Sequence, residues 1–415
     1  MFDKGQRNYS RTISRLFILI AIVTLSITQA NAEDFLYTGD PNVPASLLEY
    51  SNDSEIKIQY QSIDQLFDFA VLDVGHSYRE TAKKTRPKIG TRLKASRNIH
   101  TALEGNRFHF DAFKNDEERQ LITSIKNDLL QLPQDIPLKL LNRNEQLAYW
   151  LNLYNITLLE QLIAIYPESR ISDDLFAPDG ILNQRLVKVS GTELSLNDIQ
   201  FGIIFKIHGN NPLVMYGLFQ GFIGGPNIRK QAYTGDTVFA QLRQNAEEFI
   251  NSNRGTFKGY DDELRVSRLY QRNDRLFPDF EADLRAHLLK FTIGDYDATV
   301  TNASRIVADV SDIHIADISG GYREFGGSAA TSSAALLDSI KGTGLNPAIV
   351  NLGLISETFV DNTRFNGLKA EESTEIILKL NANRRIRGGS VNIQQDPELE
   401  EQNKDQEAQA PEVQN

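Results

Sequence analysis

The stretch LNRNEQLAYWLNLYNITLLEQLIAIYP, at residues 141–167, decides the fold. Between Leu147 and Ile165, apolar residues occupy almost every face of a helix. A surface helix keeps one polar face, whereas a helix that is apolar all round is buried. We therefore predict a helix in the middle of a domain, with Asn144 as its N-terminal cap.

Three polar residues interrupt this apolar helix. Glu145 stands at its start, and Asn152 and Asn155 lie inside it. Buried amides need hydrogen-bond partners. One interpretation is that the two amides bind neighbouring backbone groups, and the other is that they line a central cleft with Glu145. The sequence leaves both interpretations open.

The segments before this helix predict a strand and a second helix. Residues 105–113 (GNRFHFDAF) alternate like a short strand. Asn115 and Glu118 have the spacing of a capping box, and an apolar stripe follows them. We expect this helix to end before Pro133, since proline is common just past a helix end.

The segments after it alternate between short strands and helices. RLVKVSGTELSL, at residues 185–196, predicts a hairpin that turns at Ser190-Gly191, and Ser195 caps the helix that follows. The other predicted elements are a buried strand-like run at 211–226, helices at 236–252 and about 279–290, a β-rich stretch at 298–319 and a small-residue helix near 329–340. The predicted class is α+β: a helix-rich single large domain with a small mixed sheet packed around a central buried helix.

The first 32 residues have the three parts of a secretory signal peptide. The basic residues Lys4, Arg7, Arg11 and Arg15 come first, an uncharged run at 16–28 follows, and Ala30-Asn31-Ala32 ends the segment. A membrane-spanning helix needs about 20 apolar residues, and this run is shorter. We predict a cleaved leader and an exported, soluble protein, periplasmic or secreted, with no transmembrane segment after cleavage.

These elements predict the domain organisation. The signal peptide covers 1–32, a linker or loosely ordered arm 33–60, one large domain about 61–395, and a disordered acidic tail 396–415. The tail has no core-forming residues, so nothing in it offsets the entropy of ordering.

Charge and cysteine content exclude several kinds of function. The chain has 44 Lys and Arg and 55 Asp and Glu, and without residues 1–32 these become 40 and 54, a net charge of −14. Nucleic acid requires a basic surface, so it is not the expected partner. The absence of cysteine excludes disulfides, thiolate nucleophiles and thiolate zinc sites.

Four sequence blocks, in this order, resemble the DUF547 domain family. They are NRNEQLAYWLNLYN at 142–155, NDIQFGI at 197–203, NPLVMYGL at 211–218 and AYTGDTVFAQLRQNAEEFIN at 232–251. The resemblance covers residues about 105–280. It implies that the β-rich stretch at about 298–320 is an addition to the core that family members share. The family occurs in secreted bacterial proteins and, in plants, beside coiled-coil segments, which implies an interaction module there.

The chain departs from the family at each position where the family carries reactive groups. Members typically have a Glu-His pair after the hairpin, a His in the next strand and a Cys a few residues later. Here these positions read Gln200, Phe201, Met215 and Gln220, and Gly225 replaces a second Cys. A Cys activated by a nearby His is a workable nucleophile, whereas a carboxamide hydrogen-bonds but does not exchange protons.

Other patterns for metal or cofactor binding are missing from the sequence. The six histidines are His76, His100, His109, His208, His287 and His314. They form no HExxH motif and no pair at helical spacing, so we expect no metal. The glycine-rich stretch at 320–328 has neither GxGxxG nor a following Lys, so we expect no cofactor.

Two hypotheses on function follow. The first is a non-catalytic exported protein that binds a partner protein or small ligand through a degenerate cleft. The cleft would be lined by Glu145, Asn152, Asn155, Gln200, Met215, Gln220 and His109. The second is a hydrolase with relocated groups, at His109 with Ser or Asp neighbours. The replaced residues favour the first, and a His–nucleophile pair within about 3.2 Å would favour the second.

Overall fold

The structure is a computed structural model that describes most of the chain between residues 37 and 318. The described residues are 37, 39, 41–81, 100–101, 103–168, 170–209, 211–318 and a strand at 392–394. The signal peptide, the glycine-rich stretch at 320–328, the helix near 329–340 and the acidic tail therefore lie outside the described residues. All described helices and strands belong to one unit that begins at Gly39.

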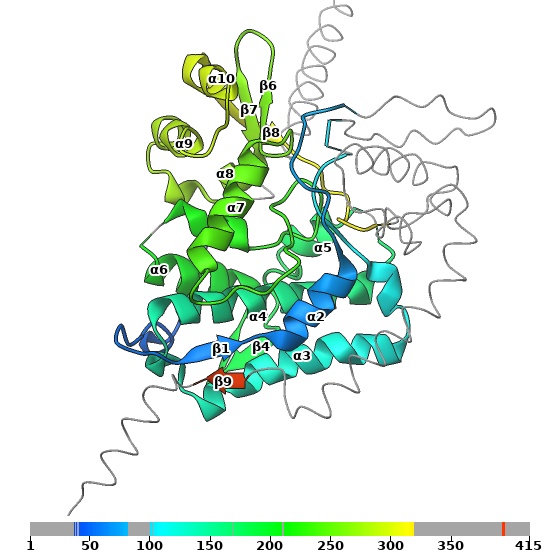
Figure 1. The fold of residues 1–415 in the computed structure, drawn as a ribbon, viewed down its shortest axis with the longest axis vertical. Coiled ribbons are helices and arrows are strands. Elements are labelled where there is room, and N and C mark those ends of the chain that lie inside the picture. The colour runs from blue at the N-terminus through cyan, green and yellow to red at the C-terminus, as the bar shows by residue number, and fades with distance from the viewer. Residues whose placement is uncertain are drawn as a thin grey trace, which may run out of the picture. The chain divides into compact units, whose positions relative to one another are not determined.

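The centre of this unit is α4 (Arg143–Ile165), which is buried on all sides as the sequence predicted (Figure 1). Its aromatic residues Tyr149, Trp150 and Tyr154 are fully enclosed. Around it pack α3 (Asp116–Asp135), the π-helix η4 (Asp198–Ile204) and α7 (Val238–Ile250). The cap is Asn142, not Asn144, because its side chain accepts the N–H groups of Asn144 (3.0 Å) and Glu145 (2.9 Å).

Shorter helices complete the helical part of the fold. The α-helices are α2 (Gln61–Ala70), α5 (Ser172–Phe176), α6 (Phe205–Ile207), α8 (Arg268–Arg272), α9 (Phe280–Leu288) and α10 (Tyr296–Asn302). The 3-10 helices are η1 (Ala45–Leu47), η2 (Phe110–Phe113), η3 (Leu138–Leu140), η5 (Pro212–Gly217) and η6 (Asp274–Leu276).

The strands form small separate sheets, which confirms the α+β class. The antiparallel pairs are β1 (Lys57–Gln59) with β9 (Asn392–Gln394), β2 (Val71–Leu72) with β3 (Arg107–Phe108), and β4 (Val187–Val189) with β5 (Thr192–Leu194). A mixed sheet joins β6 (Thr256–Lys258), β7 (Leu264–Ser267) and β8 (Ile306–Val310), with β7 and β8 parallel. Helix α8 packs against this mixed sheet, and helices pack around α4.

The predicted hairpin and two of the predicted helices are confirmed. Strands β4 and β5 turn at Ser190 and Gly191, whose φ angles of 49° and 82° are those of a tight hairpin turn. Helices α7 and α9 lie where helices were expected at 236–252 and 279–290.

Several other expectations were wrong. The run at 211–226 is buried but begins as the 3-10 helix η5, because Asn211 accepts the N–H of Leu213 and Pro212 follows the cap. Pro133 lies inside α3, not past its end. The stretch from residue 298 begins within α10, and only β8 and single bridges after it are extended.

Residues 41–60 are held against the core instead of forming a loose arm. Val43, Leu47, Ile58 and Tyr60 are buried, and β1 pairs with β9 (Figure 1). The segment is polar on average, so its composition did not indicate that these four apolar residues would be buried. None of the described helices is both long and apolar enough to cross a membrane.

Candidate functional site

The two amides of α4 bind backbone groups of neighbouring segments. Asn152 donates to the carbonyl of Tyr233 (2.8 Å) and accepts its N–H (2.9 Å). Asn155 donates to the carbonyl of Gly217 (3.0 Å) and accepts the N–H of Phe219 (2.9 Å). Both side chains therefore fix loops against the central helix, each through one donated and one accepted hydrogen bond to backbone groups.

Glu145 lies where α4, β1 and the loop before α7 meet. It is 2% exposed, and Oε2 accepts the N–H of Ile58 at 3.4 Å. A Cβ on Gly235 would stand 2.3 Å from Oε1, so only glycine leaves room for this carboxyl. Burial, with the negative charge of Asp236 adding to it, raises the pKa of Glu145 to about 7.

The structure brings Gln200 and Gln220 to the end of one short helix, α8. Gln200, on the π-helix, donates to Asn273 Oδ1 at 2.7 Å. Gln220 donates to the carbonyl of Leu218 (3.1 Å) and accepts a guanidinium N–H of Arg272 (3.3 Å). The two positions where the sequence resemblance implies an acid and a thiol are therefore linked here through the adjacent residues Arg272 and Asn273. π-Helices are rare and occur often at functional sites.

The other two family positions are filled by apolar side chains. Met215 is fully buried in η5. Phe201 packs edge-on against Phe205, with its ring centroid 4.5 Å from the guanidinium carbon of Arg275. Neither position offers a group that can take up a proton.

Arg272 is a residue of this site that sequence analysis missed. It is 9% exposed, and its guanidinium carbon lies 4.8 Å and 5.5 Å from the ring centroids of Phe176 and Phe222. Burial lowers the pKa of Arg272 to about 10, so it keeps its positive charge at neutral pH. Its sequence context, RLYQRND, carries no motif that could have singled it out.

His109 lies at a different place in the fold. It follows β3 and precedes η2, its N–H donates to the carbonyl of Ala70 (2.8 Å), and its ring is 6.3 Å from that of Phe69. Other histidines contact hydroxyl groups. His287 is 2.9 Å from the Tyr216 hydroxyl in the core, and His100 is 3.3 Å from Thr81 Oγ1 at the surface. Burial lowers the pKa of His287 to about 4, so it is neutral.

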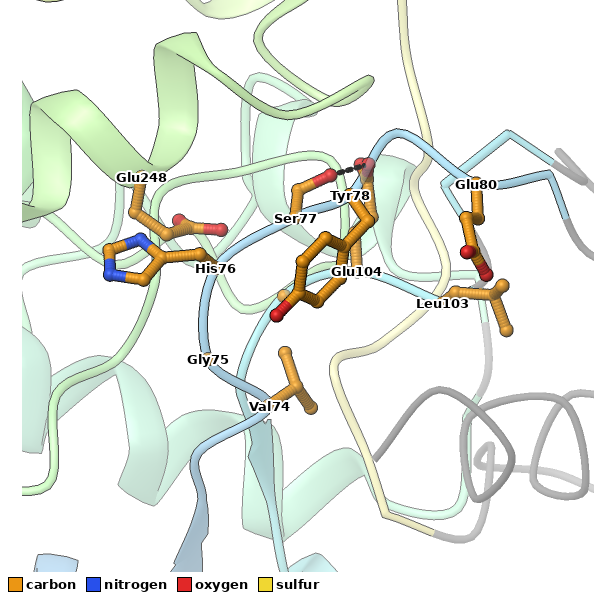
Figure 2. A pocket seen from close by; sticks show the side chains of 10 residues that line it. Val74, Gly75, His76, Ser77, Tyr78, Glu80, Leu103, Glu104 and Glu248 are labelled. Carbon is orange, nitrogen blue, oxygen red and sulfur yellow. Dashed lines mark hydrogen bonds between the residues drawn. The ribbon is translucent and has the colours of Figure 1, made fainter. Parts of the chain in front are cut away.

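A small enclosed hollow of about 10 Å³ lies between the segments at 74–80 and 103–105 (Figure 2). The Ser77 hydroxyl points to the Glu104 carboxylate and donates a hydrogen bond to it, while the His76 ring lies on the side of Glu248. A more open hollow of about 570 Å³ adjoins it and shares His76 and Glu248. Its wall includes Arg229, which is bound to Gln241, Asn245 and Gln244.

The described residues contain no group of three His, Asp or Glu side chains placed to hold a metal ion. The buried site at α8 contains three carboxamides, those of Gln200, Gln220 and Asn273, and the guanidinium of Arg272. It can donate and accept hydrogen bonds and attract an anion. It has no base at the four family positions.

The fold and this site define an α+β domain built around a buried helix, with a polar cluster where the π-helix and η5 approach α8. Residues 138–250 match the family model described as "Protein of unknown function, DUF547". This segment of the chain therefore matches the DUF547 family, as its sequence blocks indicated. No curated protein and no solved structure matches the chain. The matched segment is shorter than the 105–280 expected and ends before Arg272 and Asn273.

Proposed function

We propose that this protein is an exported, non-catalytic member of the DUF547 family that binds a partner or ligand at its degenerate family site. One observation carries the proposal. Gln200 and Gln220 replace the acid and the thiol, and both are hydrogen-bonded to the end of α8. Their carboxamides hold the site together and cannot transfer protons.

Export is proposed from the first 32 residues alone. When the full chain is expressed in a bacterial host, we expect the protein in the periplasm or medium to begin at Glu33. Intact-mass spectrometry checks this. Replacing both Ala30 and Ala32 by Arg removes the small-x-small pattern, so this variant should keep its leader. Full-length parent protein in the cytoplasm would contradict export.

A relocated hydrolase is the second candidate, and one observation favours it. Asp312 Oδ1 lies 2.7 Å from His314 Nδ1, and Oδ2 accepts the Thr101 hydroxyl at 2.6 Å. Burial acts to raise the pKa of Asp312, but the bonds from His314 and Thr101 outweigh it and hold the pKa below its usual value. A buried carboxylate that orients a half-buried imidazole is an arrangement suited to a general base.

Turnover assays separate the two candidates. The mature chain is tested on p-nitrophenyl acetate and on fluorescein-labelled casein beside His314→Ala, His109→Ala and the exposed-site control His76→Ala. We expect all four proteins to release product at the buffer rate. Turnover by the parent that is lost in His314→Ala or His109→Ala, and kept in His76→Ala, would replace the binding proposal with the hydrolase.

A further inference from the structure

We infer that the family site of this protein binds a single oxyanion group, a carboxylate or phosphate carried by a small ligand, on Arg272. This inference deepens the proposed function and rests on it for the site. It starts from an imbalance of charge. Arg272 is 9% exposed, and among the described residues no carboxylate pairs with it.

The other buried arginines of the chain show what is missing at Arg272. Arg254 pairs with both carboxylate oxygens of Glu248. The negative charges of Asp312, Asp317 and Glu104 act on Arg107. At Arg272 the charge acting from a neighbouring side chain is instead that of a second cation, Arg268, because the phenol of Tyr154 is neutral at pH 7. A buried charge is costly unless it is paired, so an anionic ligand would supply the missing partner.

The geometry around Arg272 suits a planar or tetrahedral oxyanion. Phe176 and Phe222 cover the guanidinium with their rings, and Gln220 accepts one of its five N–H groups. Aromatic cover leaves the donors in the guanidinium plane, where a carboxylate or phosphate can bind through two oxygens. Water is also kept from the faces of the group, which strengthens the attraction.

Two neighbours add to this preference for an anion. Arg268 lies four residues earlier on α8, and like charges at this spacing repel, which a bound anion would relieve. Burial raises the pKa of the Tyr154 phenol while the charge of Arg272 acts against it, so the hydroxyl stays protonated and is able to donate a hydrogen bond. The net charge of −14 after leader removal argues against a polyanion, which leaves a small ligand.

The test measures anion binding to the mature chain at constant ionic strength. Sodium phosphate and sodium acetate are titrated separately, each against sodium chloride, with the melting temperature and calorimetric heat as readouts. We expect saturable stabilisation by at least one of the two, which also tells phosphate from carboxylate. Arg272→Met should weaken that binding at least tenfold, and Arg272→Lys should weaken it less because it keeps the charge without the planar fork.

The control is Arg243→Met, which removes an exposed arginine from the outer face of α7 and should bind like the parent. Arg272→Met is expected to fold, because it removes a buried charge with no carboxylate partner. Equal binding by Arg272→Met and the parent, or no saturable effect of either anion on the parent, overturns the inference. If one of these two results is found and the protein hydrolyses neither p-nitrophenyl acetate nor casein, the anion site is ruled out but the non-catalytic function is not. Turnover together with Arg272-dependent anion binding overturns only that proposal.

Discussion

Glu145→Gln is expected to change how the stability of this protein depends on pH. Relative to the parent, the variant should gain up to about 3 kcal/mol of unfolding free energy between pH 4.5 and pH 8. The reason is that burial raises the pKa of Glu145 from an ordinary value of 4.5 to about 7. The long hydrogen bond from Ile58 N to Oε2, at 3.4 Å, the charge of Lys57 and a backbone hydrogen bond from Gly235 favour the charged form, but burial outweighs them.

The sign follows from proton binding. A carboxyl group whose pKa is raised holds its proton more tightly in the folded chain than in the unfolded chain. Its contribution is therefore fully present below about pH 4.5 and is lost as the pH rises through about 7. Glutamine keeps the shape of the neutral acid and has no proton to lose, so it avoids this loss.

Urea unfolding of both proteins at pH 5 and pH 8 measures the effect. Glu193→Gln, on the exposed side of β5, is the matched control, and its unfolding should change with pH as the parent's does. If the unfolding free energy of Glu145→Gln changes with pH as the parent's does, Glu145 does not titrate in this range and the argument from its burial fails. Because Ile58 lies in β1, the protection factors of amides 57–59, which correct for the intrinsic rise of exchange with pH, should fall between pH 5 and pH 8 in the parent and not in the variant.

The sequence predicted those parts of the fold that depend on local composition. Helix α4 could be found because its apolar residues cover every face, and the β4–β5 hairpin because Ser190-Gly191 marks its turn. The run at 211–226, where a strand is expected, begins as a 3-10 helix, because periodicity does not separate a short buried strand from a short buried helix. The pairing of β1 with β9 joins distant parts of the chain, and no local pattern marks it.

The same division holds for the candidate site. Gln200 and Gln220 could be located because they stand at family positions within recognisable blocks. Arg272 could not, because its contact with Gln220 spans 52 residues and depends on how α8 is placed. The sequence identifies Asn152 and Asn155 as polar residues of a buried helix. Only the structure shows that their partners are backbone groups of Tyr233, Gly217 and Phe219.

Arg254→Met is expected to destabilise the protein by about 3–5 kcal/mol, the cost of breaking a buried ion pair from one side. Arg254 is 1% exposed and pairs with Glu248 on α7. It also donates to the carbonyl of Gly225 at 2.6 Å, which ties the glycine-rich loop after η5 to the end of α7. Methionine would leave the Glu248 carboxylate and this carbonyl without their partner.

The double variant Arg254→Met/Glu248→Gln separates pairing from packing. It removes both charges, so it should recover part of the lost stability, and the non-additivity measures the coupling of the pair. Urea unfolding at pH 7 is the readout, with the exposed Arg243→Met as control. Equal losses in the single and double variants would mean that the contact with Gly225, not the ion pair, carries the effect.

Comparing Arg254→Met with Arg272→Met, both without ligand, tests whether the Arg272 charge lacks a partner. Both remove a buried arginine, but only Arg254 has a carboxylate partner, so only its loss should be strongly destabilising. A comparable loss for Arg272→Met would mean that the Arg272 charge is already compensated within the chain, and the case for an anionic ligand would lose its starting point.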